Sequence, residues 1–149
     1  MINIDARGPR FSAAITTVVL AVALITSNVW VIAFQAAVFA IGALRGPQFT
    51  PYAFIFKKLI KPRLKSEPIL EDVRPPRFAQ GVGLAFAVTA TIAAAAGITQ
   101  VFTVAVAFAL AAAFLNAAFN FCLGCQVYLL LLRATSKYIS KLTRRENVT

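Results

Sequence analysis

The sequence predicts an all-α integral membrane protein, in which four helices form two helical hairpins in parallel repeat, together with amphipathic interfacial segments. Its composition is 60% hydrophobic and only 13% charged, unlike that of a soluble domain. Two long runs, at residues 11–44 and 78–132, contain no charged residue, and each is longer than a single span needs. A similar charged phrase precedes each run, RGPRF at residues 7–11 and RPPRF at residues 74–78.

The first uncharged run is expected to hold two short helices. A membrane span needs roughly 20 residues, so residues 11–44 are too long for one helix. Thr26, Ser27 and Asn28 form the polar cluster of this run, as is typical of a turn. The sequence therefore predicts helices over residues 11–26 and 29–44.

The second run is expected to hold two more helices. Its turn is predicted at residues 97–100, where Gly and polar residues interrupt the apolar sequence. This places one helix over residues 78–96 and the start of the next near Val101. A third helix in this run would carry the basic residues from Arg133 onward across the membrane, so we expect four spans in all.

The basic residues predict the orientation, because Lys and Arg beside the spans mark the cytoplasmic face. They lie before the first run, between residues 45 and 77, and from Arg133 onward, whereas both predicted hairpin turns lack them. We expect an inner-membrane protein whose N-terminus, central linker and C-terminus are cytoplasmic. Such flanks, in contact with the lipid bilayer, explain a net charge of +10 without a nucleic-acid partner.

The two halves of the chain resemble each other beyond the charged phrases. We predict one membrane domain over residues 1–149: a first hairpin with an amphipathic segment (7–65), a cytoplasmic loop (66–77), and a second hairpin with a C-terminal amphipathic helix (78–149). The two phrases are 67 positions apart, whereas Tyr52 and Tyr128, which follow the two hairpins, are 76 apart. This difference predicts nine extra residues late in the second repeat.

The segments that follow the hairpins have helical hydrophobic periodicity. In the first, Phe54 and Phe56 are expected to face lipid while the neighbouring lysines face the headgroups. The stretch KSEPILEDVRPP predicts an extended loop, whose acidic residues are expected to pair with basic neighbours.

Uncharged polar residues occur within or beside the predicted spans, namely Gln35, Gln80, Asn116 and Asn120. Interhelical hydrogen bonds are the expected role for each of them. The spans contain no Asp, Glu, Lys, Arg or His. Ion-coupled transport is therefore disfavoured, because such a cycle needs an ionisable group inside the membrane.

The stretch NFCLGCQVY holds both cysteines, Cys122 and Cys125, as Cys-x-x-Cys. At helical spacing their sulfurs lie one turn apart, and at a helix N-terminus such a pair can form a disulfide while the helix dipole favours a thiolate. We expect a helix break near residues 116–120, with Asn120 capping the helix that bears the thiols. Gly124 relieves crowding there, and Tyr128 supports the site.

Three interpretations of this pair are compatible with the sequence. Zinc needs about four ligands, so two cysteines and no His make a metal site within one chain unfavourable, and no metal or cofactor is expected. Cys122 and Cys125 are then either small packing residues or a thiol site that rests as thiols in a reducing cytosol. The corresponding functions are thiol–disulfide exchange or sulfur relay with a soluble partner, or a non-catalytic accessory or assembly subunit of a larger membrane complex.

From about Asp5 to Arg133 the chain resembles a family of small bacterial integral membrane proteins, common in actinobacteria and known as a domain of unknown function. The resemblance is carried by RxPRFAQGVG at residues 74–83 and by FCLGC at residues 121–125 followed by Tyr128. It implies no established activity. It does imply association with thioredoxin-like proteins and thiosulfate sulfurtransferases.

Overall fold

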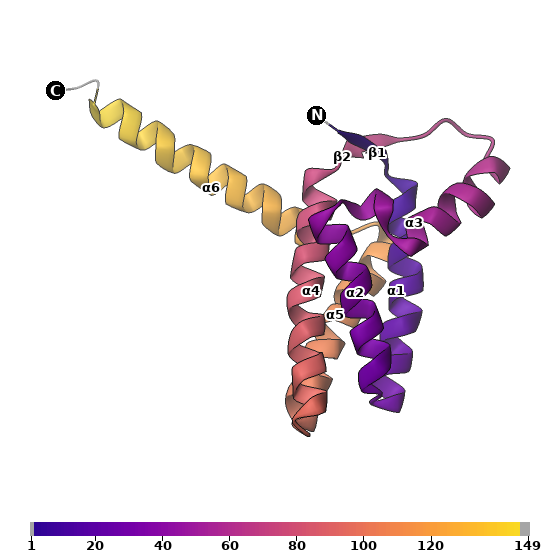
Figure 1. Cartoon of the computed structure of the whole chain (residues 1–149). Coiled ribbons are helices and arrows are strands. Elements are labelled where there is room, and N and C mark those ends of the chain that lie inside the picture. The colour runs from indigo at the N-terminus through magenta and orange to yellow at the C-terminus, as the bar shows by residue number, and fades with distance from the viewer. Residues whose placement is uncertain (1, 147–149) are drawn as a thin grey trace.

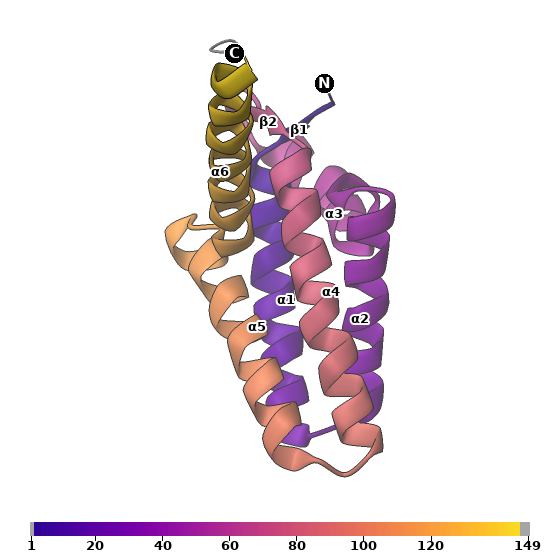
Figure 2. The same cartoon turned by 90° about the vertical axis from the view of Figure 1, so that its left-hand side faces the viewer.

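The computed structural model describes residues 2–146. Four long helices lie side by side, α1 (Arg7–Thr26), α2 (Val29–Leu44), α4 (Arg74–Ala95) and α5 (Thr99–Phe119). A fifth long helix, α6 (Leu123–Glu146), extends away from them (Figure 1). Helix α1 packs against α2 and α5, and α4 packs against the same two helices. Both hairpin turns lie at one end of this bundle, and the N-terminus, the linker and α6 lie at the other (Figures 1 and 2).

The helix bounds agree closely with the sequence-based expectation. The bounds predicted for α2 are confirmed, and its first turn is capped by Asn28, whose side chain accepts a hydrogen bond from the Trp30 amide at 2.8 Å. The turn before it is made by Ser27 in a left-handed conformation. Helices α1 and α4 begin four residues earlier than expected, because the charged phrases form their first turns instead of preceding them. Proline is well suited to a first helical turn.

Small side chains fill the centre of the bundle. The buried core contains Leu20, Ala23, Ile32, Phe39, Ala87, Ala90, Ala93, Phe102, Ala105, Val106 and Ala109. Alanine lets helices approach closely, as expected for the alanine-rich α4. At Gly83 a Cβ atom would lie 2.8 Å from the Phe39 ring, so a larger residue there would displace that ring.

Three helices, α1, α4 and α5, are long and apolar enough to cross a membrane, and α2 is a shorter apolar helix of 16 residues. Large apolar side chains also cover the outside of the bundle, among them Val18, Trp30, Phe34, Ile92 and Phe108. Exposed apolar surface of this extent is unusual on a soluble monomer. These apolar helices suggest a membrane protein.

The N-terminal segment and the linker pair with each other, which the sequence did not predict. Strand β1 (Asn3–Asp5) lies antiparallel to β2 (Leu70–Asp72). Each strand ends in an aspartate that pairs with an arginine two residues later, Asp5 with Arg7 at 2.8 Å and Asp72 with Arg74 at 2.6 Å. The expected local pairing of the loop acids is thus confirmed for Asp72. The strands hold the loop against the end of the bundle.

The linker after α2 is helical from η1 (Pro47–Phe49) through α3 (Pro51–Ile55), the π-helical turn η2 (Phe56–Ile60) and η3 (Lys61–Arg63). Phe54 is exposed, as expected, and Lys58 lies over its ring. The expectation that Phe56 also faces lipid is wrong, because Phe56 is only 4% exposed and packs against Phe11 of α1. Residues two apart in a helix point in different directions, so both rings cannot face outward.

A buried polar network joins this linker to the bundle. The Tyr52 hydroxyl donates to Gln35 Oε1 at 2.8 Å, and Gln35 Nε2 donates to Thr16 Oγ1 at 3.4 Å. Burial raises the pKa of Tyr52 to about 12. The interhelical hydrogen bond expected for Gln35 is confirmed. Within the described residues the other three polar candidates make none, and Gln80 Oε1 is buried without a partner.

The extra length of the second half lies mostly inside its helices. Helix α4 has 22 residues against 20 in α1, and α5 has 21 against 16 in α2. The expectation that the nine extra residues are inserted late is met in part, because α5 is longer than α2 by five residues (21 − 16) and ends shortly before the cysteines, while α4 is longer than α1 by two (22 − 20). The longer α5 carries the chain further along the bundle before it breaks.

Candidate thiol site

The site begins where α5 ends. Asn120 adopts a left-handed conformation, with φ of 53°, and its amide bonds to the Leu115 carbonyl. Asparagine tolerates this conformation better than most residues and often ends a helix in this way. The predicted break is thus present, but the role expected for Asn120 is wrong, because it ends α5 and does not cap α6.

Cys122 itself occupies the capping position of α6. Its Sγ accepts a hydrogen bond from the Cys125 amide at 3.2 Å, and its carbonyl accepts one from the Gln126 amide at 3.0 Å. A side chain that accepts from the amide three residues later is the usual arrangement at a helix N-terminus. Sequence reasoning missed this cap because cysteine is not among the residues preferred there.

Cys122 and Cys125 form a disulfide in the structure, with Cα atoms 5.2 Å apart. We expected them to rest as thiols. The first turn of a helix brings residues three apart within the Cα separation that a disulfide requires, so no rearrangement of the backbone is needed. Both residues are half-buried, which leaves the pair partly accessible from outside the chain.

Gly124 and Tyr128 fix the start of α6 on α4. A Cβ atom on Gly124 would lie 2.6 Å from both Cα and Cβ of Ala79, so only glycine permits this close contact. One turn later the Tyr128 ring packs against Phe78 at 5.5 Å between centroids. The expectation that Gly124 lets another backbone come close agrees with this geometry. These contacts fix the helical turn that carries the cysteines against α4.

Farther along, α6 leaves the rest of the protein. Every side chain from Leu129 to Arg144 is exposed, including the apolar Leu131, Tyr138, Ile139 and Leu142. Helix α6 contacts α4 and, less extensively, α5, and it then extends away from the bundle (Figure 1). The thiol site thus lies at the junction between the helical bundle and a projecting amphipathic helix.

Comparison with known proteins gives a family but no activity. The family described as "Domain of unknown function (DUF4395)" matches residues 4–133. The chain belongs to this family. The match includes the charged phrases, all four bundle helices and the cysteine pair, and it ends within α6. No curated protein and no solved structure matches the chain.

A metal centre finds no support in the described residues, where no group of three or more His, Cys, Asp or Glu side chains lies close enough to hold an ion. The acidic residues of the two strands, Asp5, Glu71 and Asp72, differ in their surroundings. Arg7 lowers the pKa of Asp5 and Arg74 lowers that of Asp72, while burial raises the pKa of Glu71. Among these residues, the cysteine pair is therefore the best candidate for a reactive site.

Proposed function

We propose that this DUF4395 protein is a four-span inner-membrane protein with its N-terminus and C-terminus in the cytoplasm. The charge distribution supports this orientation, because both hairpin turns lack basic residues and the opposite end of the bundle gathers them (Figure 1). Helix α2 would be the shortest span, at roughly 24 Å for 16 residues. Trp30, which is exposed at its start, would lie at the interface, and the bilayer would thin locally.

The two hairpins are proposed to be parallel repeats. Two matched sets of contacts support this. The Asp5–Arg7 pair at the start of α1 has its counterpart in Asp72–Arg74 at the start of α4. The second arginine of each phrase, Arg10 or Arg77, donates to a carbonyl near the end of the second helix in the other hairpin.

The proposed activity is thiol exchange, or relay of sulfur, at Cys122 and Cys125. The observation that carries it is the half-buried disulfide at the start of α6, in which the Cys125 amide donates to Cys122 Sγ. An amide donor and a helix N-terminus both stabilise a thiolate, so Cys122 is the better nucleophile of the reduced pair. Cys125 is then the resolving thiol. The partner would be a soluble cytoplasmic protein of the thioredoxin-like or sulfurtransferase kind.

The exchange proceeds in two balanced steps. The Cys122 thiolate attacks a disulfide of the oxidised partner, which forms a bond between Cys122 and the partner and releases one partner sulfur as a thiolate. The Cys125 thiolate then attacks Cys122 Sγ, which forms the disulfide of the structure and releases the second partner thiolate. The pair loses two electrons and the partner gains them.

The test is to trap the intermediate in intact membranes. A Cys125→Ser variant should accumulate a mixed disulfide or persulfide on Cys122, because the resolving thiol is absent. The matched Cys122→Ser variant should accumulate neither. Mass spectrometry of adducts on both variants measures the outcome, and the absence of any adduct on Cys122 in the first variant contradicts the proposal.

A second candidate function is that of an accessory or assembly subunit in a larger membrane complex. The observation in its favour is the projecting α6, whose apolar side chains Leu131, Tyr138, Ile139 and Leu142 are all exposed (Figure 1). Under this proposal α6 is covered by another subunit. Loss of a co-purifying complex on replacement of Leu131 and Leu142 by Ser, with no adduct in the trapping experiment, would favour it over thiol exchange.

A further inference from the structure

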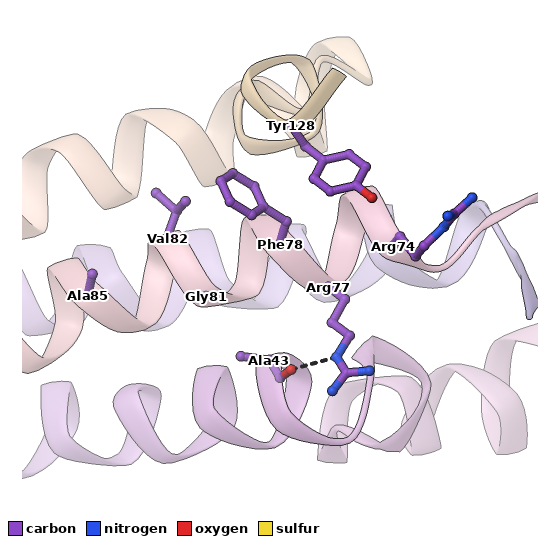
Figure 3. A pocket seen from close by; sticks show the side chains of 8 residues that line it. All are labelled: Ala43, Arg74, Arg77, Phe78, Gly81, Val82, Ala85 and Tyr128. Carbon is purple, nitrogen blue, oxygen red and sulfur yellow. Dashed lines mark hydrogen bonds between the residues drawn. The ribbon is translucent and has the colours of Figure 1, made fainter. Parts of the chain in front are cut away.

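A groove of about 600 Å³ lies on α4, between the start of α6 and the end of α2 (Figure 3). It is open to the outside of the bundle and is lined mainly by apolar surface. Phe78, Gly81, Val82 and Ala85 of α4 form its floor, and Tyr128 of α6 forms one wall. The sequence predicts a ligand-binding role for none of these residues, and for Tyr128 it predicts support of the thiols.

Three residues with hydrogen-bond donors line one end of the groove, Arg74 and Arg77 in the first turn of α4 and Tyr128 of α6. In Figure 3 the Tyr128 hydroxyl points toward Arg74, whereas Arg77 reaches toward α2 on the other side of α4. Each guanidinium already makes contacts within the chain. Arg74 binds Asp72 through Nε and Nη2, and Arg77 binds the carbonyls of Ala43 and Leu44 through the same two atoms. These contacts hold both side chains in place and leave the second terminal nitrogen of each without such a bond.

The charges at this end do not balance within the chain. Arg74 pairs with a carboxylate, whereas in the described residues no carboxylate forms a salt bridge with Arg77. The Tyr128 hydroxyl likewise takes part in no hydrogen bond of the described chain, although its ring is fixed on Phe78. An anionic group placed here would gain charge-assisted hydrogen bonds that the protein does not supply itself.

The opposite end of the groove suits a hydrocarbon chain. Gly81 lies on its floor, and a Cβ atom there would meet only Ala43 Cβ at 4.0 Å. Packing within the chain therefore does not require glycine at this position, in contrast to Gly124. Gly81 and Ala85 have small side chains, so the floor of the groove stays open along α4 from its first turn toward the hairpin turn.

We propose that this groove is a binding site for an anionic phospholipid of the inner leaflet. The phosphate binds Arg77, the rest of the headgroup reaches Arg74 and the Tyr128 hydroxyl, and one acyl chain lies over Gly81 and Ala85. The site rests on the membrane orientation proposed above but does not depend on thiol exchange. In that orientation the three donors lie at the level of the headgroups and the apolar floor lies below them, which matches the polarity of a phospholipid from head to tail.

The experiment measures lipid binding to the purified full-length protein by native mass spectrometry. The protein in detergent is titrated with dioleoyl phosphatidylglycerol, with zwitterionic dioleoyl phosphatidylcholine and with water-soluble glycerol phosphate. We expect one phosphatidylglycerol to bind at least about tenfold more tightly than phosphatidylcholine, and glycerol phosphate not to compete. Equal binding of the two lipids, or competition by glycerol phosphate at the same concentration, would overturn the proposal.

Three variants, each with a matched control, locate the site. Arg77→Gln should weaken phosphatidylglycerol binding about tenfold, whereas Arg10→Gln, which loses an equivalent bond to a helix end away from the groove, should not. Tyr128→Phe should weaken it about threefold and Tyr138→Phe should leave it unchanged. Gly81→Leu should fill the groove and abolish the preference, whereas Thr89→Leu, on an exposed part of α4, should not.

The outcomes also separate other occupants from lipid. If Gly81→Leu converts a dimer into monomers while phosphatidylglycerol binding is unchanged, the groove holds a second copy of the chain, and the lipid proposal is wrong. Extraction of membranes with alkaline carbonate tests the orientation separately. A protein that stays in the membrane but shows no lipid preference contradicts the groove site alone, and one that is released contradicts the membrane proposal itself.

Discussion

Arg10 and Arg77 occupy the same position in the two charged phrases, and each binds a carbonyl near the end of a helix in the opposite hairpin. Arg10 Nε donates to the Ala117 carbonyl of α5 at 3.1 Å, and Arg77 Nε donates to the Ala43 carbonyl of α2 at 2.7 Å. A cation is favourable at a helix C-terminus, where carbonyls lack partners. The two hairpins therefore clamp each other at the end of the bundle that carries the linker.

This relationship predicts that the two arginines stabilise the bundle independently. Replacing either one by Ala should lower the free energy of unfolding by about 1 kcal/mol, and the double variant should lose the sum, because the two sites lie on different helix pairs. Unfolding of the purified variants in detergent, followed by circular dichroism, measures this. If only the Arg77 variant loses stability, the contact between Arg10 and the Ala117 carbonyl is not formed in the protein in detergent.

The orientation can be tested with reporters. Fusions after Thr149 and between Lys61 and Lys65 should report the cytoplasm, and a tag at Ser27 should report the outside, because basic flanks retain their segments inside. For labelling, a Ser27→Cys substitution is placed in a variant that lacks Cys122 and Cys125, so that the reagent reacts at position 27 alone. An external C-terminus would be incompatible with four spans.

The buried position of Phe56 gives a matched pair of linker variants. Phe56→Ser should destabilise the contact between linker and α1 by about 3 kcal/mol, since it removes a buried ring that packs on Phe11, whereas Phe54→Ser should have little effect. Trypsin should then cleave the lysine-rich linker faster in the first variant only. Equal cleavage rates would mean that η2 is already detached from the bundle.

Much of the bundle could be predicted from the sequence, because unbroken apolar runs and polar turn residues are local signals. The bounds of α2 followed directly from the turn at Ser27 and Asn28. The β1–β2 pair could not be predicted, since it joins segments far apart in the chain that have no apolar alternation. For the same reason the sequence identified Cys122 and Tyr128 but not the cap made by Cys122 Sγ or the groove beside Tyr128.

The acidic residues of the β1–β2 pair predict opposite responses to pH. Arg7 lowers the pKa of Asp5, so the stability that Asp5 contributes is present above its ordinary pKa and is lost as the pH falls through the lowered value. Burial raises the pKa of Glu71, so its contribution is favourable only at low pH and is lost as the pH rises through the raised value. Asp5→Asn should therefore reduce acid sensitivity, and Glu71→Gln should stabilise the protein near neutral pH. Thermal unfolding between about pH 3 and 7 measures both.

The last prediction concerns which thiol reacts first once the disulfide is reduced. The Cys125 amide lies 3.2 Å from Cys122 Sγ, and this donor belongs to the backbone, so it survives when Cys125 is replaced by Ser. Cys122 in the Cys125→Ser variant should therefore remain activated, whereas Cys125 in the Cys122→Ser variant has no equivalent donor among the hydrogen bonds of the described chain.

We expect alkylation of Cys122 by iodoacetamide in intact membranes to be about tenfold faster at neutral pH than alkylation of Cys125, and the difference to shrink as the pH rises and both thiols ionise. Mass spectrometry of the two single-cysteine variants gives both rates. Because both cysteine residues are half-buried in the same helical turn, access alone cannot produce a large difference that depends on pH in this way. Slow and equal labelling of the two variants would mean that the pair serves packing, and the accessory-subunit function would then replace thiol exchange.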